Sequence, residues 1–298
     1  MSHVVTLVSN PDRPILTSTL VSRVRDCLPN PAESRWLAEG IAADIGFAPS
    51  GADALAGLDG AIRHALAGEP VDLFLQFAAT RRKRLLLADM DSTMIGQECI
   101  DELADFVGQK AKVSAITERA MRGEIAFEPA LRERVALLAG LAAGIVEQVL
   151  AERITLTPGG RTLVATMRAH GGHTALVSGG FTVFTGPIAA MIGFDENHGN
   201  VLELDGAAFR GTVREPILGR EAKLANLKRL RTEKGLAESE TLAIGDGAND
   251  LDMLREAGLG VAFHAKPAVA AAAHARVDHG DLTALLYAQG YSRDTFAG

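Results

Sequence analysis

The stretch Leu85-Leu86-Leu87-Ala88-Asp89-Met90-Asp91-Ser92-Thr93 indicates the fold class of this 298-residue chain. Its first four residues form a continuous apolar run, which is typical of a strand buried on both faces of a parallel sheet. Polar residues follow at once, and two aspartates stand one residue apart. Because ligands of open α/β sheets bind at the carboxyl ends of the strands, Asp89 and Asp91 are candidate site residues.

Two later apolar runs also end in polar clusters. Residues 174–177 lead into Ser178-Gly179-Gly180, and residues 241–244 lead into Gly245-Asp246-Gly247-Ala248-Asn249-Asp250. Helical patterns alternate with these runs, which predicts βαβ units around a parallel sheet. We therefore expect the three polar clusters to converge on one crevice at the carboxyl edge of that sheet.

The rest of the chain predicts two further units around this α/β sheet. Residues 98–157 are nearly all helical in character and interrupt the sheet, which predicts an inserted helical cap. Residues 1–80 predict a small α/β domain, and residues 81–298 the larger one. The small domain has strand-like and helical patterns at 4–8, 15–27, 41–47, 52–67 and 71–77. The basic run Arg81-Arg82-Lys83-Arg84 is expected to be a solvated linker.

Composition excludes some classes of protein. The net charge of −7 argues against a dedicated nucleic-acid binder, although a few local cations are enough to capture a phosphate. Cys27 and Cys99 show neither a CxxC spacing nor a metal-type cluster, so we expect free thiols in a reducing compartment. The sequence contains no signal-peptide pattern and no run near the roughly 20 apolar residues of a membrane helix. We expect a cytoplasmic protein.

Four aspartates are predicted to meet in the crevice: Asp89, Asp91, Asp246 and Asp250. Like charges repel and burial penalises each of them, so the set predicts a divalent cation among the carboxylates. Oxygen donors without histidine or cysteine favour a hard ion, and Mg²⁺ suits a few carboxylates combined with water and phosphate oxygens. A single aspartate at a strand end is more often a helix N-cap, an alternative that the joint occurrence of four argues against.

Two further features are weak on their own. Ser178-Gly179-Gly180 precedes a helix predicted at 182–192, and its glycines would let a phosphate approach the backbone near a helix N-terminus. Such segments are often merely tight connections between a strand and a helix. Lys223 lies on a predicted helix from 219 to about 231, where a lysine is usually solvated.

The ordered motifs resemble those of a known family. Asp89-Met90-Asp91-Ser92-Thr93 fits the DxDx[TV] signature of the haloacid dehalogenase (HAD) superfamily, and the other clusters follow in that superfamily's order over about residues 84–290. Glu98, Val177-Ser178-Gly179-Gly180-Phe181 and the cap segment 121–135 are similar to the phosphoserine phosphatase family in particular. Residues 1–80 bear a weaker resemblance to the ACT-like domain of its longer bacterial members.

The resemblance implies a HAD-like, Rossmannoid parallel sheet with a helical cap, and it implies metal-binding and catalytic roles. Asp89 would be the nucleophile and a Mg²⁺ ligand. Asp91 would be the general acid and base, with its backbone carbonyl on the metal. Asp246 would complete the protein ligands, and Asp250 would support the metal directly or through water.

The resemblance also implies a set of substrate-binding residues: Glu98, Arg134, Ser178, Gly179, Lys223 and Asn249. Ser178, Gly179 and Lys223 would hold the phosphate, and Asn249 would lie beside it. Glu98 and Arg134 would bind the ammonium and carboxylate groups of a serine moiety.

The activity implied is hydrolysis of O-phospho-L-serine to L-serine and phosphate through an aspartyl-phosphate, the last step of L-serine biosynthesis. One alternative is transfer to another acceptor such as homoserine, or hydrolysis of a different small phosphomonoester. An alternative of another class is a catalytically silent amino-acid sensor, which predicts a lost nucleophile, whereas Asp89 is present. The partner that we expect is the small-molecule substrate, L-phosphoserine. Charge and hydropathy argue against nucleic acid and membranes as partners, and a homodimer is an open alternative.

Overall fold

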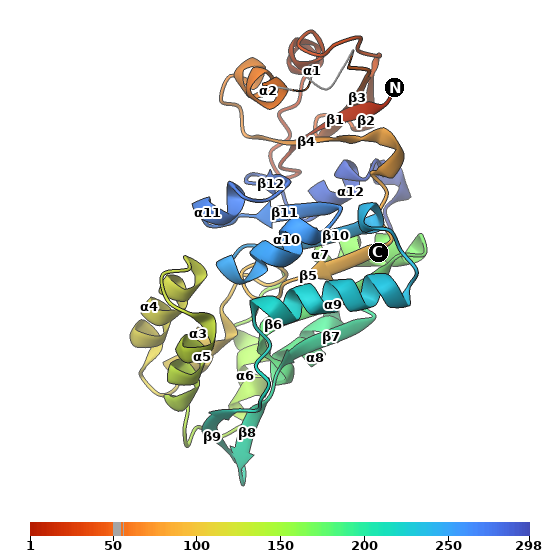
Figure 1. Cartoon of the computed structure of the whole chain (residues 1–298). Coiled ribbons are helices and arrows are strands. Elements are labelled where there is room, and N and C mark those ends of the chain that lie inside the picture. The colour runs from red at the N-terminus through yellow and green to blue at the C-terminus, as the bar shows by residue number, and fades with distance from the viewer. Residues whose placement is uncertain (50–54, 56) are drawn as a thin grey trace.

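Two sheets organise the chain in the computed structural model, which describes residues 1–49, 55 and 57–298 (Figure 1). A four-stranded antiparallel sheet has the order β2-β3-β1-β4, and a six-stranded parallel sheet has the order β12-β11-β10-β5-β6-β7. A separate hairpin pairs β8 with β9. The parallel sheet with helices on both faces is the fold that the apolar runs predicted.

The antiparallel sheet belongs to an N-terminal βαββαβ unit. Its elements are β1 (His3–Ser9), α1 (Ser18–Arg25), β2 (Ser34–Ala38), β3 (Ala42–Phe47), α2 (Leu58–Leu66) and β4 (Val71–Phe77). Side chains alternate across β1, so Val5 and Leu7 pack with the two helices while Val8 joins the core of the parallel sheet. Strand β2 was not predicted, and residues 52–54 and 56 of the helix predicted at 52–67 lie outside the described residues.

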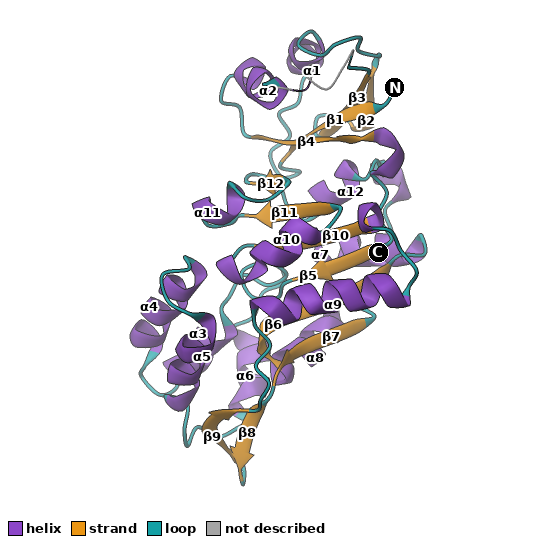
Figure 2. Ribbon diagram, viewed as in Figure 1, coloured by secondary structure: helices purple, strands orange, loops and turns teal. Residues whose placement is uncertain are grey.

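The parallel sheet carries the larger core, with helices on both faces (Figure 2). Its strands are β5 (Leu85–Ala88), β6 (His173–Phe181), β7 (Glu196–Asn200), β10 (Thr241–Gly245), β11 (Leu259–Phe263) and β12 (Ala275–Val277). Its helices are α7 (Gly160–Ala169), α8 (Thr182–Ile192), α9 (Arg220–Glu233), α10 (Leu251–Glu256), α11 (Pro267–Ala270) and α12 (Ala284–Ala288). Leu85 and Leu87 pack on one face of β5, and Leu86 and Ala88 on the other, so this strand is buried on both faces as predicted.

A helical cap lies between β5 and α7. It consists of α3 (Cys99–Asp105), α4 (Lys110–Met121), α5 (Phe127–Ala136) and α6 (Ile145–Glu152), and it contacts the hairpin of β8 (Leu202–Asp205) and β9 (Ala208–Val213). Two short connections join the cap to the sheet, and Ile95 of one forms an isolated antiparallel bridge with Leu156 of the other. The amide of Gly96 donates to the carbonyl of Thr155 at 3.0 Å, so the two connections are bonded to each other.

The basic run after β4 is the expected solvated linker only in part, because Arg82 and Arg84 are exposed but Lys83 and Arg81 have partners inside the protein. Lys83 is buried, and its Nζ donates to the carbonyls of Thr80 and Ser239 at 2.9 and 2.7 Å. Arg81 pairs with Asp44 at 2.8 Å, and the Arg82 guanidinium lies 3.4 Å from the centre of the Tyr291 ring. A run of basic residues in the sequence does not show which distant residues it contacts, so the sequence alone predicts a solvated linker.

A buried carboxylate also joins the two sheets. Asp72 of β4 accepts hydrogen bonds from the amides of Asp278, His279 and Gly280 at 2.7, 3.2 and 2.7 Å. The N-terminal unit therefore supports a loop of the larger unit. Among the described residues, no helix combines the length and the apolar character that crossing a membrane requires.

Candidate active site

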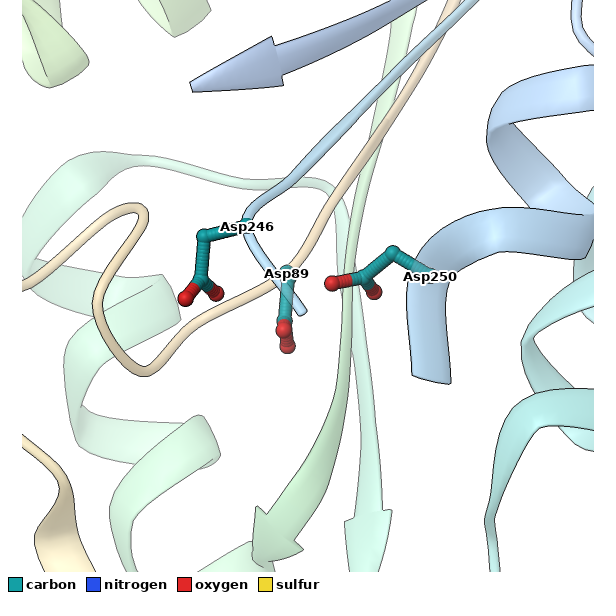
Figure 3. Close-up of side chains that lie close together, drawn as sticks. All are labelled: Asp89, Asp246 and Asp250. Atoms are coloured by element: carbon teal, nitrogen blue, oxygen red, sulfur yellow. The ribbon is translucent and has the colours of Figure 1, made fainter. Parts of the chain in front are cut away.

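Three aspartates meet at the carboxyl ends of neighbouring strands. Asp89 follows β5, Asp246 follows β10, and Asp250 ends the short helical turn that precedes α10 (Figure 3). One carboxylate oxygen from each lies within 4.8 Å of the other two, and all three residues are buried. Gly245 makes room for this arrangement, because a Cβ at that position would lie 2.3 Å from Cγ of Asp250.

Lys223 of α9 is buried against this cluster. Its Nζ lies 2.8 Å from Oδ1 of Asp89 and 2.6 Å from Oδ1 of Asp250, and the residue has 0% exposure. Burial alone would lower the pKa of Lys223, but the charges of Asp250 and Asp89 raise it above its ordinary value. The usual reading of a helical lysine as solvated is therefore wrong here.

The cluster carries an excess of negative charge, since three carboxylates face one ammonium. Burial, together with the charges of Asp250 and Asp89, raises the pKa of Asp246 well above its ordinary value. Burial and the Asp89 charge raise the pKa of Asp250 to about 7. When all three carboxylates are ionised, they exceed the ammonium by two negative charges, and such a set of oxygen donors fits a hard divalent cation.

Asp91 lies apart from the three-aspartate cluster. Its half-buried side chain faces the adjacent cavity, and its Oδ1 accepts from the amide of Cys99 at 3.3 Å. Burial raises the pKa of Asp91 to about 7, with a contribution from the Asp89 charge. A carboxyl group with this pKa exchanges a proton near neutral pH, which suits a general acid or base.

The cavity has a volume of about 50 Å³ and lies between the sheet and the cap. Most of the predicted site residues line it: Asp89, Asp91, Glu98, Arg134, Ser178, Gly179 and Asn249. Lys223, Asp246 and Asp250 do not line it but belong to the cluster around Asp89. The structure thus brings every predicted site residue into one region.

The segment Ser178-Gly179-Gly180 differs from its prediction, because it lies within β6 and is not a turn after that strand. Ser178 Oγ accepts from the amide of Gly180 at 2.8 Å. A Cβ at Gly179 would lie 2.6 Å from Cζ of Phe127, so this glycine allows the cap helix α5 to approach the sheet. Asn200 holds the other side, where its Nδ2 donates to the carbonyl of Gly179 at 2.8 Å.

Two charged residues occupy the cap side of the cavity. Glu98 lies just before α3, and its Oε1 accepts from Ser92 Oγ at 2.6 Å. Burial raises the pKa of Glu98 well above its ordinary value, and the charges of Asp91 and Asp246 add to that effect. Arg134 of α5 is 4% exposed, and burial lowers the pKa of its guanidinium.

Sequence reasoning did not identify several residues of this site. Thr117 and Phe127 line the cavity from the cap, and Asn200 holds the backbone of β6. None of them belongs to a catalytic motif, and each acts through partners distant in the chain. Polar residues in cap helices carry no local signal that separates a cavity wall from an outer surface.

Comparison with known proteins agrees with this geometry. A model of haloacid dehalogenase-like hydrolases matches residues 86–255. The chain belongs to the haloacid dehalogenase-like hydrolase family. Phosphatases of this family generally use a divalent metal ion, and the three buried aspartates are a group of oxygen donors that could hold one.

Similar proteins within the family share a name. A "Phosphoserine phosphatase" of Streptomyces coelicolor is 40% identical over 97% of this chain and 71% of its own length. A solved structure of "Phospho-Aspartyl Intermediate Analogue of Phosphoserine phosphatase" is 36% identical, with a TM-score of 0.65 over 69% of this chain and 98% of its own. A "probable phosphoserine phosphatase" of Vibrio cholerae is 28% identical, with a TM-score of 0.75 over 99% of this chain and 88% of its own.

Proposed function

We propose that this chain hydrolyses O-phospho-L-serine to L-serine and phosphate through an aspartyl-phosphate on Asp89. One observation carries the proposal: Asp89 and Asp91 line the same cavity as two recognition charges, Glu98 and Arg134, and Asp89 also belongs to the buried carboxylate cluster. The names of the relatives support the same substrate. The reaction would complete L-serine biosynthesis.

The chemistry follows from two carboxyl groups in different environments. The Asp89 carboxylate attacks phosphorus in line, and the bond to the seryl oxygen breaks. Asp91 protonates that leaving oxygen and then takes a proton from the water that hydrolyses the aspartyl-phosphate. The raised pKa of Asp91, about 7, supports both steps, because the group holds and releases its proton near neutral pH.

The phosphate would be held by groups on the sheet side of the cavity. Ser178 and the Gly179 backbone face it from β6, and Asn249 lies on the neighbouring wall. Lys223 places a fixed positive charge beside Asp89, where it offsets negative charge on the equatorial phosphate oxygens. Because Lys223 is held by Asp89 and Asp250, it needs little reorganisation when substrate binds.

The divalent ion would be Mg²⁺, held by Asp89, Asp246, Asp250 and the backbone carbonyl of Asp91. The small separation of the three carboxylate oxygens supports this assignment, as does the absence of nitrogen and sulfur donors from the cluster. Bound there, the ion supplies positive charge to the phosphate oxygens. Asp250 contributes either directly or through a water molecule.

Specificity for phosphoserine requires recognition of its ammonium and carboxylate groups. Glu98 offers a carboxyl group whose ionised form the substrate ammonium would favour, and Arg134 offers a planar fork of donors to the carboxylate. The test is phosphate release from a panel of small phosphomonoesters, with and without Mg²⁺ and with homoserine as an alternative acceptor. Equal rates on phosphoserine and on esters without these two groups would contradict the proposal.

We also propose a domain organisation, with residues 1–80 as an ACT-like unit and 81–298 as the phosphatase unit with its cap at about 98–157. The βαββαβ order of the first unit supports this division. A cytoplasmic location fits a biosynthetic role and the two free thiols, Cys27 and Cys99. A homodimer stays a prediction.

A further inference from the structure

The guanidinium of Arg134 is held by a small polar network inside the cap. Its Nε donates to the carbonyl of Ala130 at 3.1 Å, and its Nη1 donates to Oγ1 of Thr117 at 2.9 Å. Among the described residues, no carboxylate forms an ion pair with this buried cation. Burying an arginine without a direct counter-ion costs free energy of folding. A ligand carboxylate bound to Arg134 would offset that cost.

Behind Thr117 lies a buried carboxylate of the cap, Asp101 of α3. Thr117 Oγ1 lies 2.8 Å from Oδ1 of Asp101, and Ser114 Oγ lies 2.5 Å from Oδ2. Asp101 is 9% exposed and does not line the cavity, whereas Thr117 and Arg134 do. From the interior of the cap towards the cavity, the carboxylate of Asp101 is therefore followed by the hydroxyl of Thr117 and the guanidinium of Arg134.

The hydroxyl of Thr117 has one proton and two lone pairs, which gives this chain of groups a direction. Asp101 and the carbonyl of Val113 can only accept, at 2.8 and 3.0 Å, and the closer, charged Asp101 carboxylate is the stronger acceptor of the proton. The lone pairs are then left for Nη1 of Arg134. The Asp101 carboxylate makes the hydroxyl a better acceptor and places a negative charge near the guanidinium without direct contact.

We propose that Asp101, acting through Thr117, positions Arg134 to bind the carboxylate of the substrate. This inference rests on the proposed function, because it assumes that Arg134 meets a substrate carboxylate. Asp101 is a positioning residue, since it touches neither the substrate nor the reacting atoms. Thr117 takes Nη1 and the carbonyl of Ala130 takes Nε, so among the described residues Nη2 of Arg134 has no hydrogen-bond partner and is left for the substrate carboxylate.

Kinetics on two substrates test the proposal, with phosphoserine compared with an aryl phosphate that lacks the carboxylate. Thr117→Val keeps the shape but removes the hydroxyl, so KM for phosphoserine should rise about tenfold while kcat changes less than about twofold. The kcat/KM for the aryl phosphate should stay within about twofold of wild type. Thr117→Ser keeps the hydroxyl and should restore KM for phosphoserine.

Asp101→Asn supplies an independent variant if Thr117→Val does not fold. The new amide would donate to the Thr117 hydroxyl and compete with Arg134 for its lone pairs, so KM for phosphoserine should rise severalfold at unchanged kcat. Asp105→Asn is the matched control, because Asp105 is an exposed acid on the same helix that pairs with Arg153. The control should behave as wild type on both substrates.

Arg134→Ala separates this inference from the proposed function. Suppose that Arg134→Ala lowers the efficiency selectively on phosphoserine. If Thr117→Val and Asp101→Asn then lower the efficiency equally on both substrates, or on neither, the positioning role is wrong and the substrate assignment stands. If Arg134→Ala itself shows no selective loss, the substrate assignment fails first. Selective KM effects in all three variants, with rescue by Thr117→Ser, would support both.

Discussion

The sheet side and the cap side of the cavity differ in how their charged groups are held. On the sheet side, Asp89 lines the cavity, and Lys223 of α9 contacts Asp89 and Asp250 directly behind it. A carboxylate oxygen of Asp246 lies within 4.8 Å of both aspartates. The cap side presents Glu98 and Arg134, and each is held by a neutral hydroxyl, from Ser92 and Thr117 respectively. Charges already in contact on the sheet side suit chemistry common to all phosphomonoesters. Charges without direct partners on the cap side suit selection among them.

The largest effect is expected from the sheet side. Asp89→Asn keeps the shape of the nucleophile but removes its charge, so turnover should fall by several orders of magnitude on every phosphomonoester. The fold should survive, because the change relieves repulsion among buried carboxylates. The measurement is phosphate release from phosphoserine and an aryl phosphate. More than a tenth of the wild-type turnover on either substrate would exclude the proposed mechanism.

Removal of the metal should act on the same side and equally on all substrates. A chelator should abolish phosphate release, and Mg²⁺ should restore it, because the excess negative charge around Asp89 otherwise repels a phosphate. Ca²⁺ should inhibit, since it prefers more ligands and looser geometry than in-line transfer requires. Full activity of chelator-treated, metal-free protein would contradict the interpretation of the aspartate cluster as a metal site required for activity.

The cap side should show a smaller and selective effect. Truncating one partner of a buried charge pair costs about 2–5 kcal/mol, so Arg134→Ala should lower efficiency on phosphoserine roughly 30-fold or more. Glu98→Gln should show the same selective loss. An aryl phosphate offers neither an ammonium nor a carboxylate, and its turnover should change little. An equal loss of efficiency on both substrates would show that the cap side does not select among phosphomonoesters.

The sheet side could be predicted from sequence and the cap side only in part. Asp89 and Asp246 stand directly after apolar strands, so local pattern and motif place both at one edge of the sheet. Lys223 meets Asp250 27 positions away and Asp89 more than 100 away, so its burial depends on the fold.

The cap helix α3 illustrates the limit of local pattern. Asp101 and Asp105 look alike in sequence, yet one is buried beside Thr117 and the other is exposed beside Arg153. The strand β2 was missed for a related reason, because its sequence SRWLA mixes exposed and buried residues around an irregular register. In each case packing against distant elements decides the outcome.

The smallest effect should come from a residue that connects the two sides. Ser92 lies on the loop of the nucleophile, and its Oγ donates to Oε1 of Glu98 at 2.6 Å. Ser92→Ala removes this hydrogen bond, so the Glu98 carboxylate that would bind the ammonium should become less well oriented. Efficiency on phosphoserine should fall about three- to tenfold, with little change on an aryl phosphate.

The backbone at Ser92 offers a matched control, because its φ of 54° lies in the left-handed region that favours glycine. Ser92→Gly also removes the hydroxyl but relieves that conformation, whereas Ser92→Ala keeps the strain. If the hydroxyl orients Glu98, both variants should shift the ratio of the two substrates equally, and only their thermal stabilities should differ. A shift in Ser92→Ala that disappears in Ser92→Gly would instead assign the effect to the loop backbone, and Glu98 would then be oriented without help from the sheet side.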